Sequence, residues 1–346
     1  MAPLLSGLPK APPHSWGPGL LRACVVIGLI SWIAWSFGSR ALLGHLTAAD
    51  PCFVLAAVLV IFGNLSLRAW RWQLLFASGR IPGLWASFAA IAASYLFNNV
   101  LPARPGDVLR VFMLSSLAGM AKARALASVL IERIFDLLFA CFLFALTTRL
   151  RPLEPWLNYG ALLLGAGALL ALLLLFGMTL FRRQAADLIL ASLRHVPARF
   201  LERLSQVFET FSVGIADLLR LRSALPFLAV TTILWLTEGF VVLLTARALA
   251  IDLSFLDTII VMLVAVFASF VPTGPGQLGI FEAAVVAGMT SFGFAAETAL
   301  ALALLWHMLL LVTTSGIGAL CLLVERRAMR TQGSWRALLG NSPTAS

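Results

Sequence analysis

Charged residues are scarce in this chain. They make up 12% of its 346 residues, while 61% are hydrophobic, and a soluble domain usually carries about 25% charged residues. So few charges cannot cover a water-facing surface, which excludes a soluble globular protein. The apolar stretches are ~20 residues long, the length of a membrane-spanning helix rather than of a barrel strand. The composition therefore predicts an all-α integral membrane protein.

Motifs for metals, nucleotides and nucleic acids are missing. No CxxC, HExxH, P-loop or aromatic-basic RNA motif is present, so the pattern predicts no metal site, no cofactor and no nucleic-acid partner. Any transport would be passive or coupled to an ion gradient. The isolated cysteines and histidines are Cys24, Cys52, Cys141, Cys321, His14, His45, His195 and His307.

Six apolar segments are long enough to cross a bilayer, and two more are interrupted. We expect a disordered cytoplasmic tail at 1–19, a cytoplasmic amphipathic linker at 182–223 and a second cytoplasmic tail at 325–346. The six predicted spans are 20–39, 51–69, 125–148, 157–181, 224–249 and 297–324, and the interrupted regions are 84–120 and 255–293.

The distribution of basic residues supports this layout. Most of the 25 Lys and Arg residues fall on one side, and only Arg40, Arg149 and Arg151 fall in loops on the other. Because Lys and Arg collect on the cytoplasmic side, both termini are predicted to be cytoplasmic and the protein to lie in the cell inner (plasma) membrane. A re-entrant hairpin and a pair of short crossing helices both return the chain to the side from which it entered. The distribution of charge therefore does not distinguish these two alternatives.

The two interruptions match each other. PARPGD at 102–107 and PTGPGQ at 272–277 share P-x-x-P-G and lie 170 residues apart. The same offset brings the flanking spans into step, which predicts inverted-topology repeats, a plan typical of transporters. The first repeat is 20–148; the second comprises 149–181 and 224–324. The alternative is eight or ten plain spans with two Pro-Gly kinks.

The chemistry of the breaks favours an anion. Proline ends a helix and glycine permits a sharp turn. The next helix then begins near Asp107 or Gln277 with unpaired N–H groups facing the break, where they favour a phosphate. Arg104 and Arg110 add positive charge. The structural alternative is that Asp107 caps a helix and pairs with an arginine.

Polar residues around the two breaks form the predicted substrate-binding set. They could hold the anionic or zwitterionic headgroup of a membrane lipid, and the alternative is that they satisfy loop backbone. The set is Asn98, Asn99, Arg104, Gly106, Asp107, Arg110, Thr273, Gly276 and Gln277.

Carboxylates inside apolar segments form a predicted gating or proton-coupling set. Glu132 and Asp136 lie four residues apart on one helix face and need a cation, which Arg133, the arginines of the first break or a proton would supply. Glu238 and Glu282 stand alone in apolar sequence. The alternative is a structural ion network. The set is Glu132, Arg133, Asp136, Glu238 and Glu282.

The segment RAWRWQLLF at 68–76 mixes arginine and tryptophan at the end of a predicted span. Such residues lie at the headgroup level of a bilayer, so the pattern predicts a membrane anchor. Lipid capture is the alternative.

Four stretches together resemble a known family. In order, they are RAWRWQLLF (68–76), NNVLPARPGDVLR (98–110), ASVLIERIFDLL (127–138) and FVPTGPGQLGIFEAA (270–284). They resemble the lysylphosphatidylglycerol synthase transmembrane region, also called the flippase-like domain, over about residues 20–325. The residues in the shared motifs are Arg104, Gly106, Asp107, Arg110, Glu132, Arg133, Asp136, Pro275, Gly276 and Glu282.

The resemblance implies a lipid flippase or lipid transporter and not an enzyme. In synthase members a soluble aminoacyl-transferase domain follows the membrane region, whereas here residues 325–346 follow the last predicted span, so lysyl transfer is not expected. The alternatives are a membrane enzyme acting on a lipid-linked substrate and a non-transporting scaffold of a lipid-synthesis complex. Besides lipids, a second copy of the chain and lipid-biosynthesis enzymes are candidate partners.

Arg104→Ala tests the role of the first break. We expect reduced lipid flux in proteoliposomes, because the variant lacks one of the two cations predicted to bind phosphate. The protein should still fold, as judged by gel filtration and circular dichroism. Unchanged flux in the folded variant would remove Arg104 from the predicted site.

Overall fold

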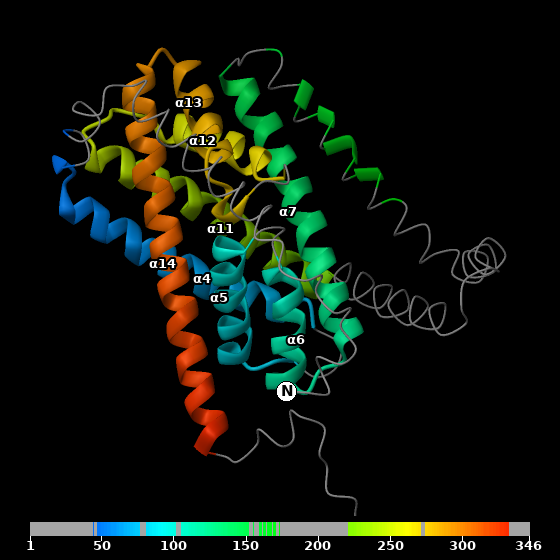
Figure 1. Cartoon of the computed structure of the whole chain (residues 1–346). Coiled ribbons are helices and arrows are strands. Elements are labelled where there is room, and N and C mark those ends of the chain that lie inside the picture. The colour runs from blue at the N-terminus through cyan, green and yellow to red at the C-terminus, as the bar shows by residue number, and fades with distance from the viewer. Residues whose placement is uncertain are drawn as a thin grey trace, which may run out of the picture.

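The chain is all-helical throughout the part that the structure describes (Figure 1). The computed structural model describes residues 44, 47–76, 81–101, 105–151, 221–270 and 274–331, together with 155, 159–160, 162–163, 165–167, 169–170 and 173. The helices are α4 (Pro51–Leu74), α5 (Leu84–Val100), α6 (Gly106–Ala118), α7 (Lys122–Leu150), α11 (Leu221–Ala248), α12 (Phe255–Ala268), the 3-10 helix η1 (Pro275–Gln277), α13 (Ile280–Thr290) and α14 (Ala296–Thr331).

The predicted all-α class is confirmed, and three helical segments are long and apolar enough to cross a membrane. They are Pro51–Leu74, Ala224–Ala248 and Ala296–Glu325. The predicted span at 125–148 is also helical, within α7, but its charged residues keep it out of this group. The predictions for 1–19, 20–39, 182–220 and 332–346, and most of 157–181, lie outside the described residues, and residues 325–331 of the predicted tail continue helix α14. The count of six spans stays a prediction.

Each half of the described chain contains a helix, a helical hairpin and a second helix. The first half is α4, α5–α6 and α7, and the second is α11, α12–α13 and α14. Figure 1 shows the α5–α6 hairpin in the lower part of the view and the α12–α13 hairpin in the upper part. The long helix α14 runs beside both hairpins, packing against α5 and α13.

The two halves meet along α4 and α11. The Asn64 side chain donates to the Leu234 carbonyl, and Arg68 donates to Glu238. In both pairs the partners are 170 residues apart, the offset of the sequence repeat. Equivalent positions of two copies touch each other only at a two-fold axis, so α4 and α11 pack around an axis of pseudo-symmetry.

The second interruption packs against the end of α5, the helix that precedes the first interruption. Asn98 caps the start of α6, since its Oδ1 accepts a hydrogen bond from the Gly106 N–H at 2.7 Å. In the second interruption Gly276 has φ +62° and fits against the end of α5, where a Cβ would lie 3.3 Å from the Asn99 carbonyl oxygen. Segments about 170 residues apart therefore form a common surface.

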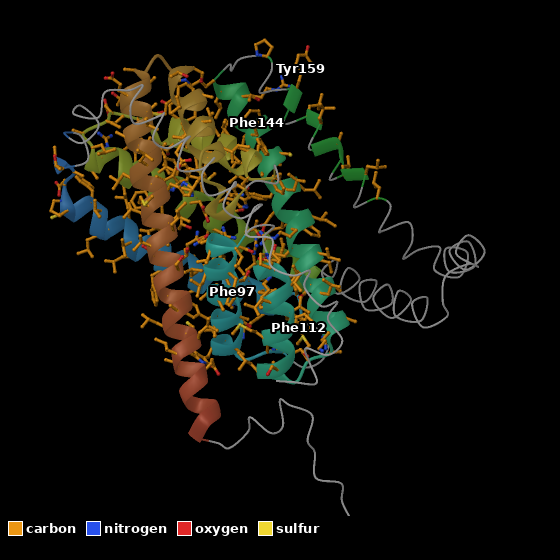
Figure 2. All side chains as sticks on the ribbon, viewed as in Figure 1. Phe97, Phe112, Phe144 and Tyr159 are labelled. Carbon is orange, nitrogen blue, oxygen red and sulfur yellow. The ribbon has the colours of Figure 1, made fainter. Side chains whose placement is uncertain are left out.

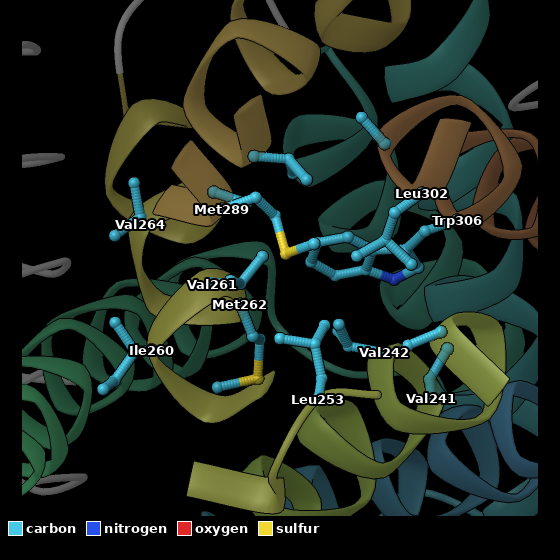
Figure 3. Packing of buried hydrophobic residues seen from close by; sticks show 14 of the residues in the cluster. Val241, Val242, Leu253, Ile260, Val261, Met262, Val264, Met289, Leu302 and Trp306 are labelled. Carbon is cyan, nitrogen blue, oxygen red and sulfur yellow. The ribbon is translucent and has the colours of Figure 1, made fainter. Parts of the chain in front are cut away.

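Apolar side chains fill the interior and also cover the outside. Between α11, α12, α13 and α14, the buried side chains of Val261, Met289, Leu302 and Trp306 pack together (Figure 3). A second cluster surrounds Trp72 between α4, α5, α6 and α7. Side chains project from every described helix (Figure 2), and large apolar residues are exposed on α4, α7 and α14. An apolar outer surface suits lipid rather than water.

Gly106→Ala should destabilise the first hairpin. A Cβ at Gly106 would lie 2.0 Å from the Ser94 carbonyl oxygen, and relieving such a clash typically costs about 1–3 kcal/mol. Gly63→Ala in α4 is the matched control, because a Cβ there meets nothing within 4 Å and alanine favours a helix. Unfolding in detergent micelles should separate the two variants; equal stabilities would contradict the close contact of α5 with α6.

Candidate functional site

A cavity of about 200 Å³ lies where the end of α5 meets the second interruption. Helices from both halves contribute to its wall, so the site depends on how the halves pack. Its charged and polar lining residues include Asn64, Arg68, Asn98, Asn99, Arg110, Glu132, Arg133, Glu238, Gln277 and His307.

A buried ion network forms one side of this cavity. Arg71 of α4 donates to Glu132 at 2.8 Å and to both Asp136 oxygens at 2.5 and 2.9 Å. The other Glu132 oxygen accepts from Arg110 at 2.8 Å. Arg71 is 1% exposed, Glu132 2% and Arg110 3%. Because a buried charge is tolerated only when it is paired, these contacts hold α4, α6 and α7 together.

Two further ion pairs extend the network. Arg133 bonds Asp107 through two contacts, at 2.7 and 3.2 Å. Arg68 bonds Glu238 across the α4–α11 contact. The network thus contains four arginines and four carboxylates, and each arginine bonds at least one carboxylate. Residues three or four apart on α4, α6 and α7 share a helix face, which brings these side chains to one side.

A second buried pair lies beside the other interruption. One Glu282 oxygen lies 2.6 Å from His307 Nδ1, and the other accepts from the Gly279 N–H at 2.6 Å. The Phe281 ring stacks on the His307 ring with centroids 4.2 Å apart. Glu282 therefore caps α13 and fixes the imidazole that faces the cavity.

Two buried donors beside the cavity have no acceptor among the described residues. They are Arg110 Nε and Trp306 Nε1, and both residues belong to the cavity wall. Arg110 also lies over the Trp72 ring, 4.9 Å from its centroid. Arg110 Nε lies 3.8 Å from Asp107 Oδ1, which is too far for a hydrogen bond but keeps the guanidinium beside a second carboxylate.

Comparison with known proteins identifies the family. The family model described as the lysylphosphatidylglycerol synthase TM region matches residues 19–318. The chain belongs to this family. The resemblance carried by the motifs is thereby confirmed for most of the chain.

Relatives of this member of the synthase TM-region family include two UPF0104 membrane proteins of Methanothermobacter thermautotrophicus. One is 25% identical over 313 residues, covering 87% of this chain and 90% of the relative. The other is 24% identical over 279 residues, covering 76% and 82%. Glycosyltransferase AglD of Haloferax volcanii is 25% identical over 309 residues, which are 79% of this chain but 49% of AglD. No solved structure gives a significant match.

The structure brings several residues of the predicted binding set to the cavity wall. They are Asn98, Asn99, Arg110, Gly276 and Gln277. Gly106 packs against α5, and Asp107 pairs with Arg133. Arg104 and Thr273 lie outside the described residues. A role in substrate binding stays a prediction for the whole set.

The predicted gating set splits into wall residues and residues directly behind them. Glu132, Arg133 and Glu238 line the cavity, while Asp136 and Glu282 bond Arg71 and His307. The prediction that Glu238 and Glu282 stand alone is wrong, because Arg68 and His307 pair with them. Their partners come from other helices, which sequence spacing within one segment does not reveal.

Sequence analysis missed Arg71 as the principal partner of Glu132 and Asp136. The prediction that 68–76 is a membrane anchor is wrong for Arg71 and Trp72, which are 1% and 0% exposed. Trp70 does point outward, with 47% exposure. Arg68 and Arg71 are three residues apart and share a helix face. This spacing could have predicted that both side chains point into the protein interior. His307 and Trp306 carried no such signal.

Arg71→Met should strongly destabilise the protein. Removing one partner of a buried ion pair typically costs about 3–5 kcal/mol, because the remaining charges lose compensation. Arg247→Met is the control, since its partner Asp252 is 90% exposed and such surface pairs contribute about 0–1 kcal/mol. Unfolding of both variants in detergent measures the difference. Similar losses would contradict the central place of Arg71.

Proposed function

We propose that this protein is a lipid flippase or lipid transporter. A polar headgroup passes through the cavity while the acyl chains stay in the bilayer. The observation that carries this proposal is a charged cavity, formed jointly by two interrupted hairpins, inside a molecule whose outer surface is apolar. At about 200 Å³ the cavity is smaller than the ~300–1,000 Å³ pockets that enclose drug-sized ligands, so it suits a headgroup rather than a whole lipid.

The arrangement of the hairpins supports alternating access. In this proposal α5–α6 and α12–α13 are re-entrant hairpins that enter the membrane from opposite faces, within six full spans and inverted repeats. Non-helical backbone at membrane depth is tolerated where it lines such a cavity. The α4–α11 contact is the axis about which one half would rock against the other, as in other transporters built from repeats. Both termini are cytoplasmic in this layout.

Headgroup binding would exchange ion pairs within the network. Arg68 and Glu238, with side chains 18% and 24% exposed, are more accessible than the pair of Arg71 with Glu132. They would open first to the charges of a headgroup, while the deeper network keeps its structure. Glu282 and His307 form the candidate proton-coupling pair, because they lie against the second interruption and share a short contact of 2.6 Å.

An enzyme acting on a lipid-linked substrate is the second candidate. The similarity to a protein named glycosyltransferase AglD favours it, although the chain spans about half of that protein. Mass spectrometry of lipids after incubation distinguishes the two functions. A new covalent product indicates the enzyme, and exchange between leaflets without a product indicates transport.

Leu311→Trp tests transport through the cavity. Leu311 lines the cavity beside Gly276, so a larger side chain should obstruct the headgroup and reduce lipid flux in proteoliposomes several-fold. Val312→Trp on the same helix is the matched control, because Val312 is 68% exposed on the outer surface. Its flux should match that of the unmodified protein. Equal flux in both variants, or no flux in the unmodified protein, contradicts transport through this cavity.

A further inference from the structure

Three amide side chains line the cavity at the end of α5 and in the second interruption. They are Asn98, Asn99 and Gln277. An amide group has one end that donates hydrogen bonds and one end that accepts them. Asn98 is held by its oxygen, since Oδ1 accepts from the Gly106 N–H at 2.7 Å. Its Nδ2 donor is therefore left for another partner.

The other two amides are held in the opposite sense. Asn99 Nδ2 donates to the hydroxyls of Thr314 and Ser315, both at 3.0 Å. Gln277 Nε2 donates to the Ser269 carbonyl at 2.8 Å, which can only accept. The oxygens Asn99 Oδ1 and Gln277 Oε1 are therefore left as acceptors.

These remaining atoms are open to the cavity. Asn98 Nδ2, Asn99 Oδ1 and Gln277 Oε1 have no partner among the described residues, and none belongs to the unpaired polar atoms that the protein encloses completely. The same is true of the hydroxyl of Tyr95, which lies one turn before Asn98 on α5 and also lines the wall. Asn64 of α4, by contrast, is bonded at both ends of its amide. The wall thus presents uncharged donors and acceptors without partners.

The backbone of Gln277 is strained where it joins this wall. Its φ is +58°, in the left-handed region that residues with long side chains rarely adopt. Such strain persists where the surrounding structure enforces it, and it is concentrated at binding and active sites. Here the Gln277 N–H donates to the Gly274 carbonyl, and the side chain bonds Ser269. The strained turn keeps the Gln277 amide in the cavity wall.

Hydroxyl groups match this combination of donors and acceptors. Because a hydroxyl both donates and accepts, several hydroxyls on neighbouring carbons can satisfy Asn98 Nδ2 and the oxygens of Asn99 and Gln277 together. An ionised phosphate cannot donate to the two carbonyl oxygens, and an ammonium group cannot accept from Asn98. Either group would leave part of the set unpaired, which is costly in an interior.

We propose, building on lipid transport as the proposed function, that the cavity binds a polyhydroxyl headgroup, which is the chemistry of a sugar. Its hydroxyls accept from Asn98 Nδ2 and donate to Asn99 Oδ1 and Gln277 Oε1. A glycolipid headgroup and a free sugar present the same hydroxyls, and flux measurements separate these two sources.

Binding of methyl glucoside tests the site directly. Methoxytetrahydropyran is the matched probe, because it has the same kind of ring and a methoxy group but no hydroxyls. Saturation-transfer NMR on the full chain, in a detergent whose headgroup carries no hydroxyls, measures both affinities. We expect saturable binding of the glucoside and at least about tenfold weaker binding of the matched probe. Equal affinities, or no saturable binding of the glucoside, overturn the proposal.

Substitutions at Gln277 separate binding from support of the turn. Gln277→Met keeps the length of the side chain and removes the acceptor, so it should weaken glucoside binding at least about fivefold. Gln277→Glu restores acceptor oxygens but not the donor to Ser269, so it should recover binding. Thr232→Val is the control, because the exposed Thr232 hydroxyl bonds the Leu228 carbonyl of its own helix, and its affinity should not change. Equal losses in the two Gln277 variants, both folded by thermal unfolding, overturn Gln277 as a binding residue and the proposal with it.

Flux measurements distinguish this inference from the proposed function. If the protein binds the glucoside but moves no lipid in proteoliposomes, lipid transport is wrong and the polyhydroxyl site stands; uptake of labelled glucose then identifies a free sugar as the source. If phosphatidylethanolamine crosses as fast as glucosyldiacylglycerol, transport stands and selection of a polyhydroxyl headgroup is wrong. Faster crossing of the glycolipid without glucose uptake supports both.

Discussion

The interior of this protein depends on the burial of Arg71 between two carboxylates. Its guanidinium bonds Glu132 and Asp136. The second oxygen of Glu132 bonds Arg110. Charges in an apolar interior persist only when each has a partner. Helices α4, α6 and α7 must therefore pack against one another in a single register. The cavity lies along the side of the network formed by Arg110, Glu132 and Arg133.

The two halves use equivalent positions in different ways. Arg71 of α4 corresponds, at the 170-residue offset, to Val241 of α11, and Arg68 corresponds to its own partner Glu238. The charged network lies almost entirely in the first half, whereas Trp306 and Leu302 of the second half belong to an apolar cluster. Both halves contribute polar residues to the cavity wall, but the second half contributes Glu238, Gln277 and His307 in place of a cluster of arginines.

The elements of the fold follow closely from local sequence. Helix α5 ends before the first Pro-Gly break and α6 begins at Gly106, because proline removes a hydrogen-bond donor and glycine permits the turn. The repeat offset read from PARPGD and PTGPGQ reappears in the contacts between α4 and α11. Candidate residues such as Asn98, Arg110 and Gln277 were selected because they lie near these breaks. Arg71, Trp306 and His307 were missed because they lie far from them in sequence.

The sequence by itself determined the membrane-protein class, the helices, the two interruptions and the internal repeat. Each of these depends on residues close together in the chain, through apolar length, helix spacing and the backbone chemistry of proline and glycine. Only the tertiary structure decided which charge pairs with which, because a buried arginine bonds the carboxylates that packing brings within 3 Å, whatever their separation in sequence. Among the residues that the structure describes, that pairing gives each arginine of the network a carboxylate partner, and it converted the apparently isolated Glu238 and Glu282 into paired groups.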